Sequence, residues 1–390
     1  MTDASLPAEH NPLYGLPRYF TIPIPANCYE WYEEMLASHP VHFDPVRDAW
    51  LVFRHEDIQR IFHDSQTFSS QTILMDGGLP SLIMMDPPDH RKMRSLVSRA
   101  FTPRAIAQLE TRITEIVNDL LDRVVEKGQM DIIEDLAFPL PATVIAEMLG
   151  VQAEDKELFR QWVSMIVGID PQGARRGSEA VVDYCKPILE QRRREPREDL
   201  ISALLAAEID GEHLSDEEIL GFCLILVIGG QETTTSLLGS TMVCLTDHPE
   251  ALQAIIAEPA LVPDAIEEVL RYRSPAHMIS RIVTTDTVLG GQEIKAGQYV
   301  LLVVAAANLD EALFPNATTF DIHRPASRHI AFGAGAHFCL GAPLSRLEST
   351  IALQIMLGRL PHIQRIKTVP LEIKTSQTLY ALKHVPIRFG

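Results

Sequence analysis

The stretch FGAGAHFCLG at residues 332–341 decides the fold, and a helix is expected after it, through Arg346. Its three glycines can adopt positive φ and let the backbone approach something flat and bulky. Cys339 lies where the helix should begin, so the positive end of the helix dipole and the free N–H groups there favour its thiolate, the form that binds metal. The stretch therefore predicts a metal-binding cysteine in a glycine-rich loop.

The spacing within residues 332–341 resembles the heme-binding loop of the cytochrome P450 family, F-G-x-G-x-H-x-C-x-G, which has an arginine five residues after its last glycine, the place that Arg346 fills. A chance match in such a chain is on the order of one in a million. A lone cysteine is otherwise most often a small buried hydrophobe, which would give the glycines no purpose. The resemblance implies heme b (iron protoporphyrin IX), with Cys339 as its thiolate ligand and His337 beside a heme propionate.

The composition is that of a globular protein, because 46% of the 390 residues are hydrophobic and 22% are charged. No linker, repeat or low-complexity run divides the chain, so a single domain spanning residues 1–390 is expected. The formal charge of −18 argues against a nucleic-acid partner.

Two sequence features bear on location. The longest apolar runs, 222–230 and 300–307, are too short to span a bilayer, and the N-terminus lacks the pattern of a secretory signal. We therefore expect no membrane partner and a cytoplasmic location. The cysteines are scattered without a C-x-x-C pair, which fits a reducing compartment and favours neither a disulfide framework nor a zinc site. They are Cys28, Cys185, Cys223, Cys244 and Cys339.

A basic stretch stands out in this acidic chain. It consists of Arg91, Lys92, Arg94, Arg99 and Arg104. Two interpretations stay open: a solvated helix face, or a docking patch for an acidic partner.

Helical periodicity dominates the chain, so a mainly α fold with a small β region (α+β) is expected. One helix is predicted to begin at about residue 56, and a separate helix is predicted to end at about residue 100. Further helices are predicted at residues 29–37, 105–126, 138–149, 154–167, 181–194 and 263–273. Strands are predicted at residues 41–43 and 50–53, as a hairpin, and at 279–283, 288–289 and 299–304. Between residues 168 and 177 the helical pattern breaks, which predicts a loop. The resemblance would make it a mobile lid over a substrate channel, and an ordinary loop is the alternative.

The sequence Asp86-Pro-Pro-Asp-His90 predicts the first turn of the helix that ends near residue 100. His90 and Arg94 are four residues apart and share one face of that helix. By themselves they could be an exposed pair without a role. They resemble the D-P-P-x-H-x-x-x-R segment of the cytochrome P450 family, which implies that they hold a heme propionate through charge-assisted hydrogen bonds.

The longest predicted helix begins at the capping box Ser215-Asp-Glu-Glu218 and extends to about Asp247. Some thirty residues make a rod of roughly 45 Å, long enough to cross the molecule. Its middle, GGQETTT at residues 229–235, puts two glycines and three β-branched residues where a helix prefers other types, and each glycine costs about 1 kcal/mol. A cost of this kind suggests a function.

This middle segment resembles the oxygen-binding motif of the same family, [AG]-G-x-[DE]-T. The glycines would leave room beside the porphyrin, and Thr233 would turn its hydroxyl toward the carbonyl four residues earlier, which loosens the helix into a groove. Glu232 and Thr233 would then form an acid–alcohol pair that passes protons to bound O2. Close packing of two helices would explain the glycines but not Glu232 and Thr233.

Two further motifs lie in the C-terminal third. Glu268 and Arg271 match the E-x-x-R pair of the family, and Arg324 is the expected third member of a buried network that braces the heme loop. Alone such a pair is a weak signal. Arg281 matches the arginine that binds a propionate in relatives, so the resemblance gives four residues for two propionates: His90, Arg94, Arg281 and His337.

The resemblance implies a heme-thiolate monooxygenase that inserts one oxygen atom of O2 into a C–H bond of an apolar small molecule, such as a fatty acid, terpenoid, steroid or macrolide. Electrons would come from a separate ferredoxin or flavodoxin and its reductase. The alternatives are a peroxygenase, a non-oxygenating relative or a heme-binding sensor. Apolar residues predict the substrate pocket. They are Leu74, Met75, Leu82, Ile83, Met84, Leu226, Gly229, Ala276, Met278 and Ile279.

Overall fold

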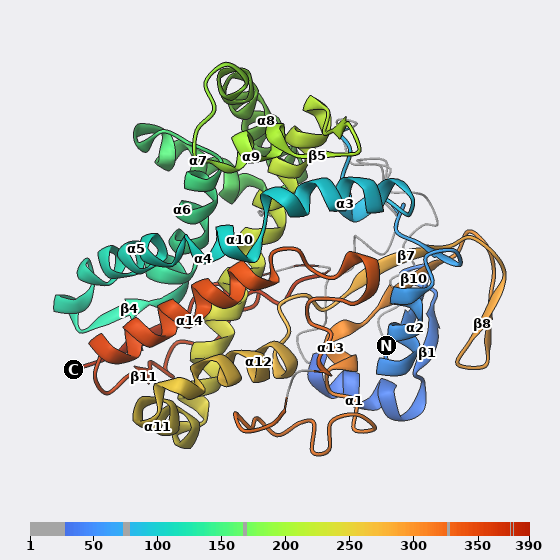
Figure 1. Ribbon diagram of the computed structural model, residues 1–390. Coiled ribbons are helices and arrows are strands. Elements are labelled where there is room, and N and C mark those ends of the chain that lie inside the picture. Colours follow the sequence, from blue (N-terminus) through green and yellow to red (C-terminus); the bar gives the residue numbers. More distant parts are fainter. Residues whose placement is uncertain (1–27, 73–78, 167–169, 326–327, 375, 377) are drawn as a thin grey trace.

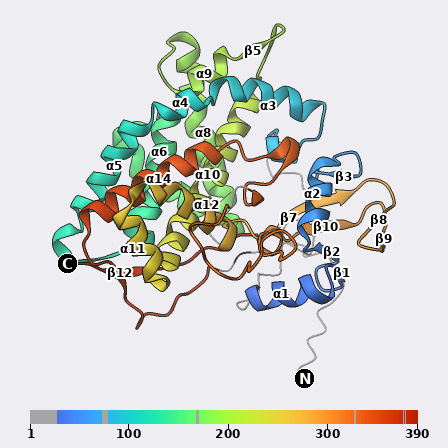
Figure 2. The same cartoon turned by 60° about the horizontal axis from the view of Figure 1, so that its bottom comes forward.

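A helix of 32 residues, α10 (Asp216–Asp247), runs through the middle of the protein (Figure 1). The structure is a computed structural model that describes residues 28–72, 79–166, 170–325, 328–374, 376 and 378–390. Helices fill the larger part on one side of the molecule, and most strands gather on the other side, near the N-terminal end of the chain (Figures 1 and 2).

The start of α10 confirms the capping box. The hydroxyl of Ser215 accepts from the backbone N–H of Glu218, and the Glu218 carboxylate accepts from the backbone N–H of Ser215 at 2.8 Å. By length and composition this is the one described helix that could cross a membrane, but 78% of its apolar window is buried inside the protein. It is therefore the core helix of this fold, packed against α6, α8, α12 and α14.

Among the remaining helices, α14 lies beside both α10 and α5, whereas α1, α2 and α13 lie on the side of the strands (Figure 1). Their bounds are α1 (Cys28–Ser38), α2 (His55–His63), α3 (Asp89–Ala100), α4 (Pro103–Ala107), α5 (Glu110–Asp122), α6 (Pro139–Met148), α7 (Lys156–Ile166), α8 (Pro171–Arg194), α9 (Leu200–Ala206), α11 (Pro249–Ala257), α12 (Val262–Tyr272), α13 (Val304–Ala307) and α14 (Ala342–Arg359).

Two predicted boundaries were wrong. The helix expected at residues 105–126 is divided, because α4 ends at Ala107 and α5 begins at Glu110. The loop expected at 168–177 is helical from Pro171, since Asp170 caps α8 and proline suits its first turn. Gly177 has a packing role there, because an added Cβ would lie 2.8 Å from the carbonyl oxygen of Trp162 on α7. Residues 167–169 lie outside the described part of the chain.

The small β region is confirmed, and its main sheet has five strands in the order β1-β2-β10-β7-β3. The predicted hairpin is present, with Val41 opposite Val52, and Asp48 takes φ 53° in its turn. Parallel pairing of β10 with β2 joins this hairpin to the C-terminal third. The strands are β1 (Val41–Asp44), β2 (Ala49–Val52), β3 (Phe68–Ser69), β4 (Gln129–Asp131), β5 (Glu208–Ile209), β6 (Glu212–His213), β7 (Ile279–Val283), β8 (Thr287–Leu289), β9 (Gln292–Ile294), β10 (Tyr299–Leu302), β11 (Gln364–Arg365) and β12 (Pro386–Arg388).

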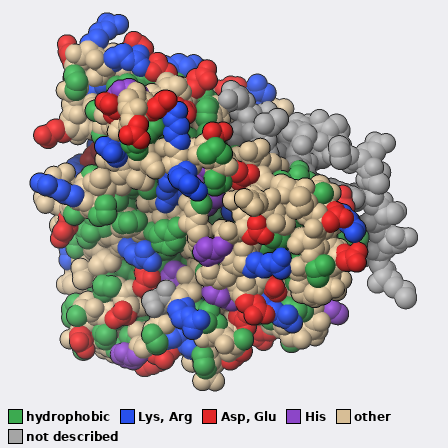
Figure 3. Space-filling model, turned by 45° about the vertical axis from the view of Figure 1, so that its right-hand side comes forward, with side chains coloured by type: hydrophobic (Ala, Val, Ile, Leu, Met, Phe, Trp, Pro, Cys, Tyr) green, Lys and Arg blue, Asp and Glu red, His purple; other side chains and the backbone are tan. Residues whose placement is uncertain are grey.

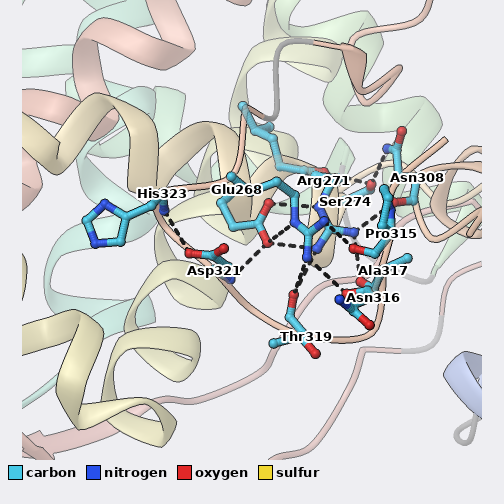
Figure 4. Close-up of polar contacts among 12 residues, drawn as sticks. Glu268, Arg271, Ser274, Asn308, Pro315, Asn316, Ala317, Thr319, Asp321 and His323 are labelled. Atoms are coloured by element: carbon cyan, nitrogen blue, oxygen red, sulfur yellow. Dashed lines mark hydrogen bonds and ion pairs between the residues drawn. The ribbon is translucent and has the colours of Figure 1, made fainter.

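The predicted E-x-x-R network is present and buried (Figure 4). The fully buried Arg271 donates to both carboxylate oxygens of Glu268, at 2.7 Å each, and Arg324 donates to Glu268 at 3.3 Å. Arg271 also donates to the carbonyls of Asn308 and Ala317 at 3.0 and 2.8 Å. One guanidinium thus ties α12 to the long segment that leads into the glycine-rich loop.

The basic stretch around α3 is not one uniform patch. Lys92 pairs with Glu212 at 3.0 Å on the surface, and Arg99 is exposed, but Arg94 turns inward and donates to the carbonyl of Phe338 at 2.6 Å. On the face shown in Figure 3, basic and acidic side chains are interspersed, so no field of a single sign covers it.

Candidate heme and oxygen site

The glycine-rich loop leads into α14 and exposes part of Cys339. Gly333 and Gly335 take φ +69° and +66°, and an added Cβ at Gly335 would collide with the carbonyl oxygen of Phe62. These two glycines are therefore required by the backbone. Gly341 has φ −79°, so it does not use the positive φ that glycine permits. It lies beside Cys339, and a Cβ added at Gly341 would be 3.9 Å from the cysteine sulfur.

Backbone groups fix the position of Cys339. Its N–H donates to the carbonyl of Phe332 at 2.9 Å, which closes the loop. Burial raises the pKa of the Cys339 thiol, while hydrogen bonds from the N–H groups of Gly341 and Ala342 lower it. These N–H groups at the start of α14 stabilise a thiolate, and a coordinated metal ion would complete the deprotonation.

Arg346 braces this loop from α14. Its guanidinium donates to both carboxylate oxygens of Glu267 on α12, at 2.6 and 2.9 Å, and lies 4.6 Å from the ring centroid of Phe332. His329 also contacts Glu267 at 3.1 Å. Burial alone would raise the pKa of Glu267, but the hydrogen bonds from Arg346 and His329 outweigh it and lower that pKa to about 2.

Two histidines from distant segments meet beside the loop. The ring centroids of His90 on α3 and His337 lie 4.0 Å apart, and Ser70 is 3.0 Å from Nε2 of His337. Burial lowers the pKa of both, that of His337 to about 3, and Arg94 lowers the pKa of His90 further. Both rings are therefore neutral near pH 7 and donate as imidazoles, whereas the sequence suggested a cationic His90. Nε2 of His90 is buried without a hydrogen-bond partner.

Arg281 adds a positive charge to this cluster from β7. Its side chain is buried, donates to the carbonyl of Ser280 at 2.7 Å and lies 5.8 Å from the centroid of Phe62. Burial lowers the pKa of Arg281 to about 10. Within the described residues no carboxylate lies within ion-pair distance of Arg281 or Arg94. The four predicted residues thus come together as donors. The charge of Asp86 acts on Arg281, but its carboxylate accepts from Ser69 and Ser70 instead.

This donor set fits a heme. In the described ranges no three His, Cys, Asp or Glu side chains form a metal cluster, so Cys339 does not belong to an all-protein metal site. One thiolate suffices for an iron whose equatorial ligands come from a macrocycle. The buried Arg281 and the orphaned Nε2 of His90 fit its carboxylate groups, since charge-assisted hydrogen bonds to carboxylates are strong.

The middle of α10 has an exposed position at Gly229, where the sequence suggested a groove, and this position is the opening of α10. Gly229 is exposed although most of the helix is buried, and an added Cβ there would meet nothing within 4 Å. Thr233 donates its hydroxyl hydrogen to the carbonyl of Gly229 at 2.6 Å, as predicted. The predicted loosening of the helix was wrong, because the backbone remains α-helical throughout. The opening therefore comes from the missing side chain of Gly229. Gly230 faces the packed side, where an added Cβ would lie 3.0 Å from Ile145.

The neighbouring residue Glu232 is buried. Its Oε1 accepts from Nζ of Lys374 at 2.9 Å, and its Oε2 is buried without a partner. No motif pointed to Lys374, which lies 142 residues away in sequence. Likewise, no sequence motif pointed to Ser70.

The predicted pocket residues divide into three sets. Leu82, Leu226 and Met278 are buried, while Met84, Ala276 and Ile279 are half-buried. Ile83 is 47% exposed, and its place in the substrate pocket stays a prediction. Leu74 and Met75 lie outside the described residues. Ala276 pairs with Leu379 of the last hairpin, which brings that hairpin to the predicted pocket wall.

Comparison with known proteins agrees with this geometry. Residues 157–387 match the family model described as Cytochrome P450. Cytochrome P450 109 of Bacillus spizizenii is 40% identical over 95% of this chain and 92% of its own. Cytochrome P450 CYP109Q5 of Chondromyces apiculatus has a TM-score of 0.89 at 42% identity, over 93% of this chain and 95% of its own. CYP109E1 of Bacillus megaterium, solved in complex with testosterone, has a TM-score of 0.88 at 39% identity, over 93% and 99%.

Proposed function

Since this chain belongs to the cytochrome P450 family and is a monooxygenase, we propose that it inserts one oxygen atom of O2 into a C–H bond of an apolar molecule of about steroid size. The electrons come from a separate ferredoxin or flavodoxin with its reductase. We further propose that residues 1–390 act as one catalytic domain; the cytoplasmic location stays a prediction.

The cofactor is heme b, with Cys339 as its protein ligand. The loop hydrogen bond to Phe332 and the N–H groups of Gly341 and Ala342 hold the sulfur in place. When bound, the heme supplies the iron at which O2 is activated, and thiolate ligation favours O–O cleavage. His90, Arg94, Arg281 and His337 bind the propionates, and the lack of a carboxylate partner for the buried Arg281 supports this assignment.

Glu232 and Thr233 carry protons to the site. The carboxylate is buried beside the opening of α10, and its free Oε2 can accept and release a proton. Thr233 holds its hydroxyl against the carbonyl of Gly229, so its oxygen faces a fixed direction. The single observation that carries this function is the exposed Gly229 in the largely buried α10, with the acid Glu232 and the alcohol Thr233 one helical turn further along.

An apolar substrate suits the buried Leu82, Leu226 and Met278. Two comparisons support a steroid-sized molecule, because CYP109E1 of Bacillus megaterium was solved with testosterone and with corticosterone. Fatty acids, terpenoids and macrolides are the other classes to be screened.

The test has two parts. A panel of these four classes is titrated while the spectral shift that follows loss of the iron-bound water is recorded, and hits are turned over with NADH and redox partners or with H2O2. We expect a steroid-sized hit and product with NADH. Turnover with H2O2 alone would indicate a peroxygenase, and binding without turnover would indicate a sensor.

The second part compares Thr233→Ala with Thr241→Ala. Thr241 also donates to the carbonyl four residues earlier in α10, at 2.8 Å, but it is buried. Thr233→Ala should continue to consume NADH while the product per NADH falls about tenfold or more. Thr241→Ala should behave like the parent. Equal product yields in both variants would refute the acid–alcohol role.

A further inference from the structure

The only described cation bonded to Glu232 is Lys374, and it comes from the last hairpin rather than from α10. Nζ of Lys374 lies 2.9 Å from Oε1 of Glu232. The carboxylate side chain is 5% exposed, whereas the lysine side chain is 30% exposed. An unpaired polar group at this depth would be strongly disfavoured, so the bond from the ammonium group offsets the burial of Glu232 and holds its carboxylate in one orientation.

The ion pair between Lys374 and Glu232 leaves only one of the two carboxylate oxygens of Glu232 with a hydrogen-bond partner. Oε1 accepts the bond from Lys374, while Oε2 is buried and has no hydrogen-bond partner. A carboxylate held by one oxygen cannot rotate freely, so the other oxygen has a defined position. That free oxygen is the one able to take and release a proton.

The hairpin that carries Lys374 also forms part of the predicted pocket wall. The backbone N–H of Lys374 donates to the carbonyl of Ala381 at 2.7 Å, which fixes the hairpin register. Toward the tip, the carbonyl of Thr378 accepts from His277 at 2.7 Å, and Leu379 pairs with Ala276. The orientation of Glu232 is thus tied to the segment that would contact substrate.

We propose that Lys374 is a positioning residue, which holds Glu232 through Oε1 so that Oε2 delivers protons to the oxygen site. The inference rests on the proposed function, since it assigns the residue that orients the proposed acid. The proposal adds no chemical step: two protons from water, two electrons from NADH and O2 still give the hydroxylated product and one water.

The experiment compares Lys374→Met, Lys374→Arg and Lys383→Met in the heme-loaded enzyme. Lys383 is the matched control, because it lies on the same hairpin and pairs with Glu372 at 2.9 Å, but on the surface. Lys374→Met should lower product per NADH about tenfold, raise H2O2 release and increase the solvent deuterium isotope effect. Substrate affinity should stay within about threefold. Lys374→Arg should recover most of the yield, and Lys383→Met should match the parent.

A second measurement does not depend on activity. An amine-acylating reagent, followed by mass spectrometry, should label Lys374 more slowly than Lys383 in the parent, and Glu232→Gln should raise labelling of Lys374 severalfold. Unchanged labelling, or a parent-like yield in Lys374→Met, would overturn the inference. Equal losses in the Met and Arg variants together with weaker substrate binding would also overturn it, since that pattern indicates a structural role.

The two proposals fail in distinguishable ways. In the Glu232→Gln background, Lys374→Met should have no further effect on yield. If Glu232→Gln and Thr233→Ala both leave the yield unchanged, the acid–alcohol role itself is wrong. If those two variants lose product while Lys374→Met does not, only the role of Lys374 is wrong.

Discussion

The imidazole rings of His90 and His337 lie with their centroids 4.0 Å apart, although 247 residues separate them in the chain. Their contact brings the start of α3 to the glycine-rich loop, next to the buried guanidinium of Arg281. The buried guanidinium of Arg281 has no ion pair with any described carboxylate, which is costly without an anion. The cost explains why the same substitution can have opposite effects on the heme-free protein and on heme binding.

Arg281→Met should stabilise the heme-free protein and weaken heme binding. Removal of an unpaired buried charge should raise the free energy of unfolding by on the order of 1–4 kcal/mol. Loss of a charge-assisted hydrogen bond to a propionate should weaken heme affinity by roughly 10–100-fold. Urea unfolding of the heme-free protein and heme transfer to apomyoglobin measure the two effects, with the exposed Arg99→Met as control. Two changes of the same sign would contradict the assignment.

Arg271→Lys should unfold much of the protein although it keeps the charge. Lysine cannot reproduce the two bonds to Glu268 together with those to Asn308 and Ala317. The free energy of unfolding should fall by about 3–5 kcal/mol. Arg193→Lys, in a surface ion pair, should leave the free energy of unfolding close to that of the parent. A stable Arg271→Lys protein with full heme content would refute the bracing role.

Glu267→Gln should remove part of the acid sensitivity of the fold. The folded pKa of Glu267 is about 2, below its ordinary value of 4.5. The pair with Arg346 therefore adds stability that is complete above about pH 4.5 and is lost as the pH falls toward 2. We expect the variant to lose about 1–3 kcal/mol at pH 7 and to show a flatter decline below pH 4.5. Unfolding curves that stay parallel to the parent at every pH would exclude this.

Glu348→Gln should have the opposite pH dependence. Burial raises the pKa of Glu348 on α14 to about 8, so the folded protein retains a proton that the unfolded chain releases above its ordinary value of 4.5. The folded state is therefore penalised as the pH rises from about 4.5 to 8. Glutamine should change little at pH 4 and should add on the order of 2–5 kcal/mol at pH 8.5. Thermal unfolding at both pH values checks this, and an equal effect at both would contradict it.

Local patterns predicted the elements well, since caps, turns and periodicity act within a few residues. The capping box at Ser215 and the Thr233–Gly229 hydrogen bond are of this kind. The loop expected at residues 168–177 was wrong from Pro171 onward, because the helix continues there although the periodic pattern breaks, and Gly177 allows α8 to approach α7. The role of Gly177 is a contact between two helices, and no local sequence pattern contains such a contact.

The site could be predicted only in part, because some of its contacts join residues that are far apart in the sequence. The family motif gave Cys339, His90, Arg94, Arg281 and His337, and the fold brings them together as donors. It gave no partner for Glu232 or Arg346, because Lys374 and Glu267 meet them only through the tertiary fold.

The most direct test of the central claim is the spectrum of the reduced protein under carbon monoxide. A thiolate from Cys339 should give a band at about 450 nm, the wavelength for which the family is named. Cys339→Ala should lose this band, and Cys244→Ala, which removes a buried cysteine from α10, should keep it. A parent protein without the band, or a Cys339→Ala protein that retains it, would contradict the assignment.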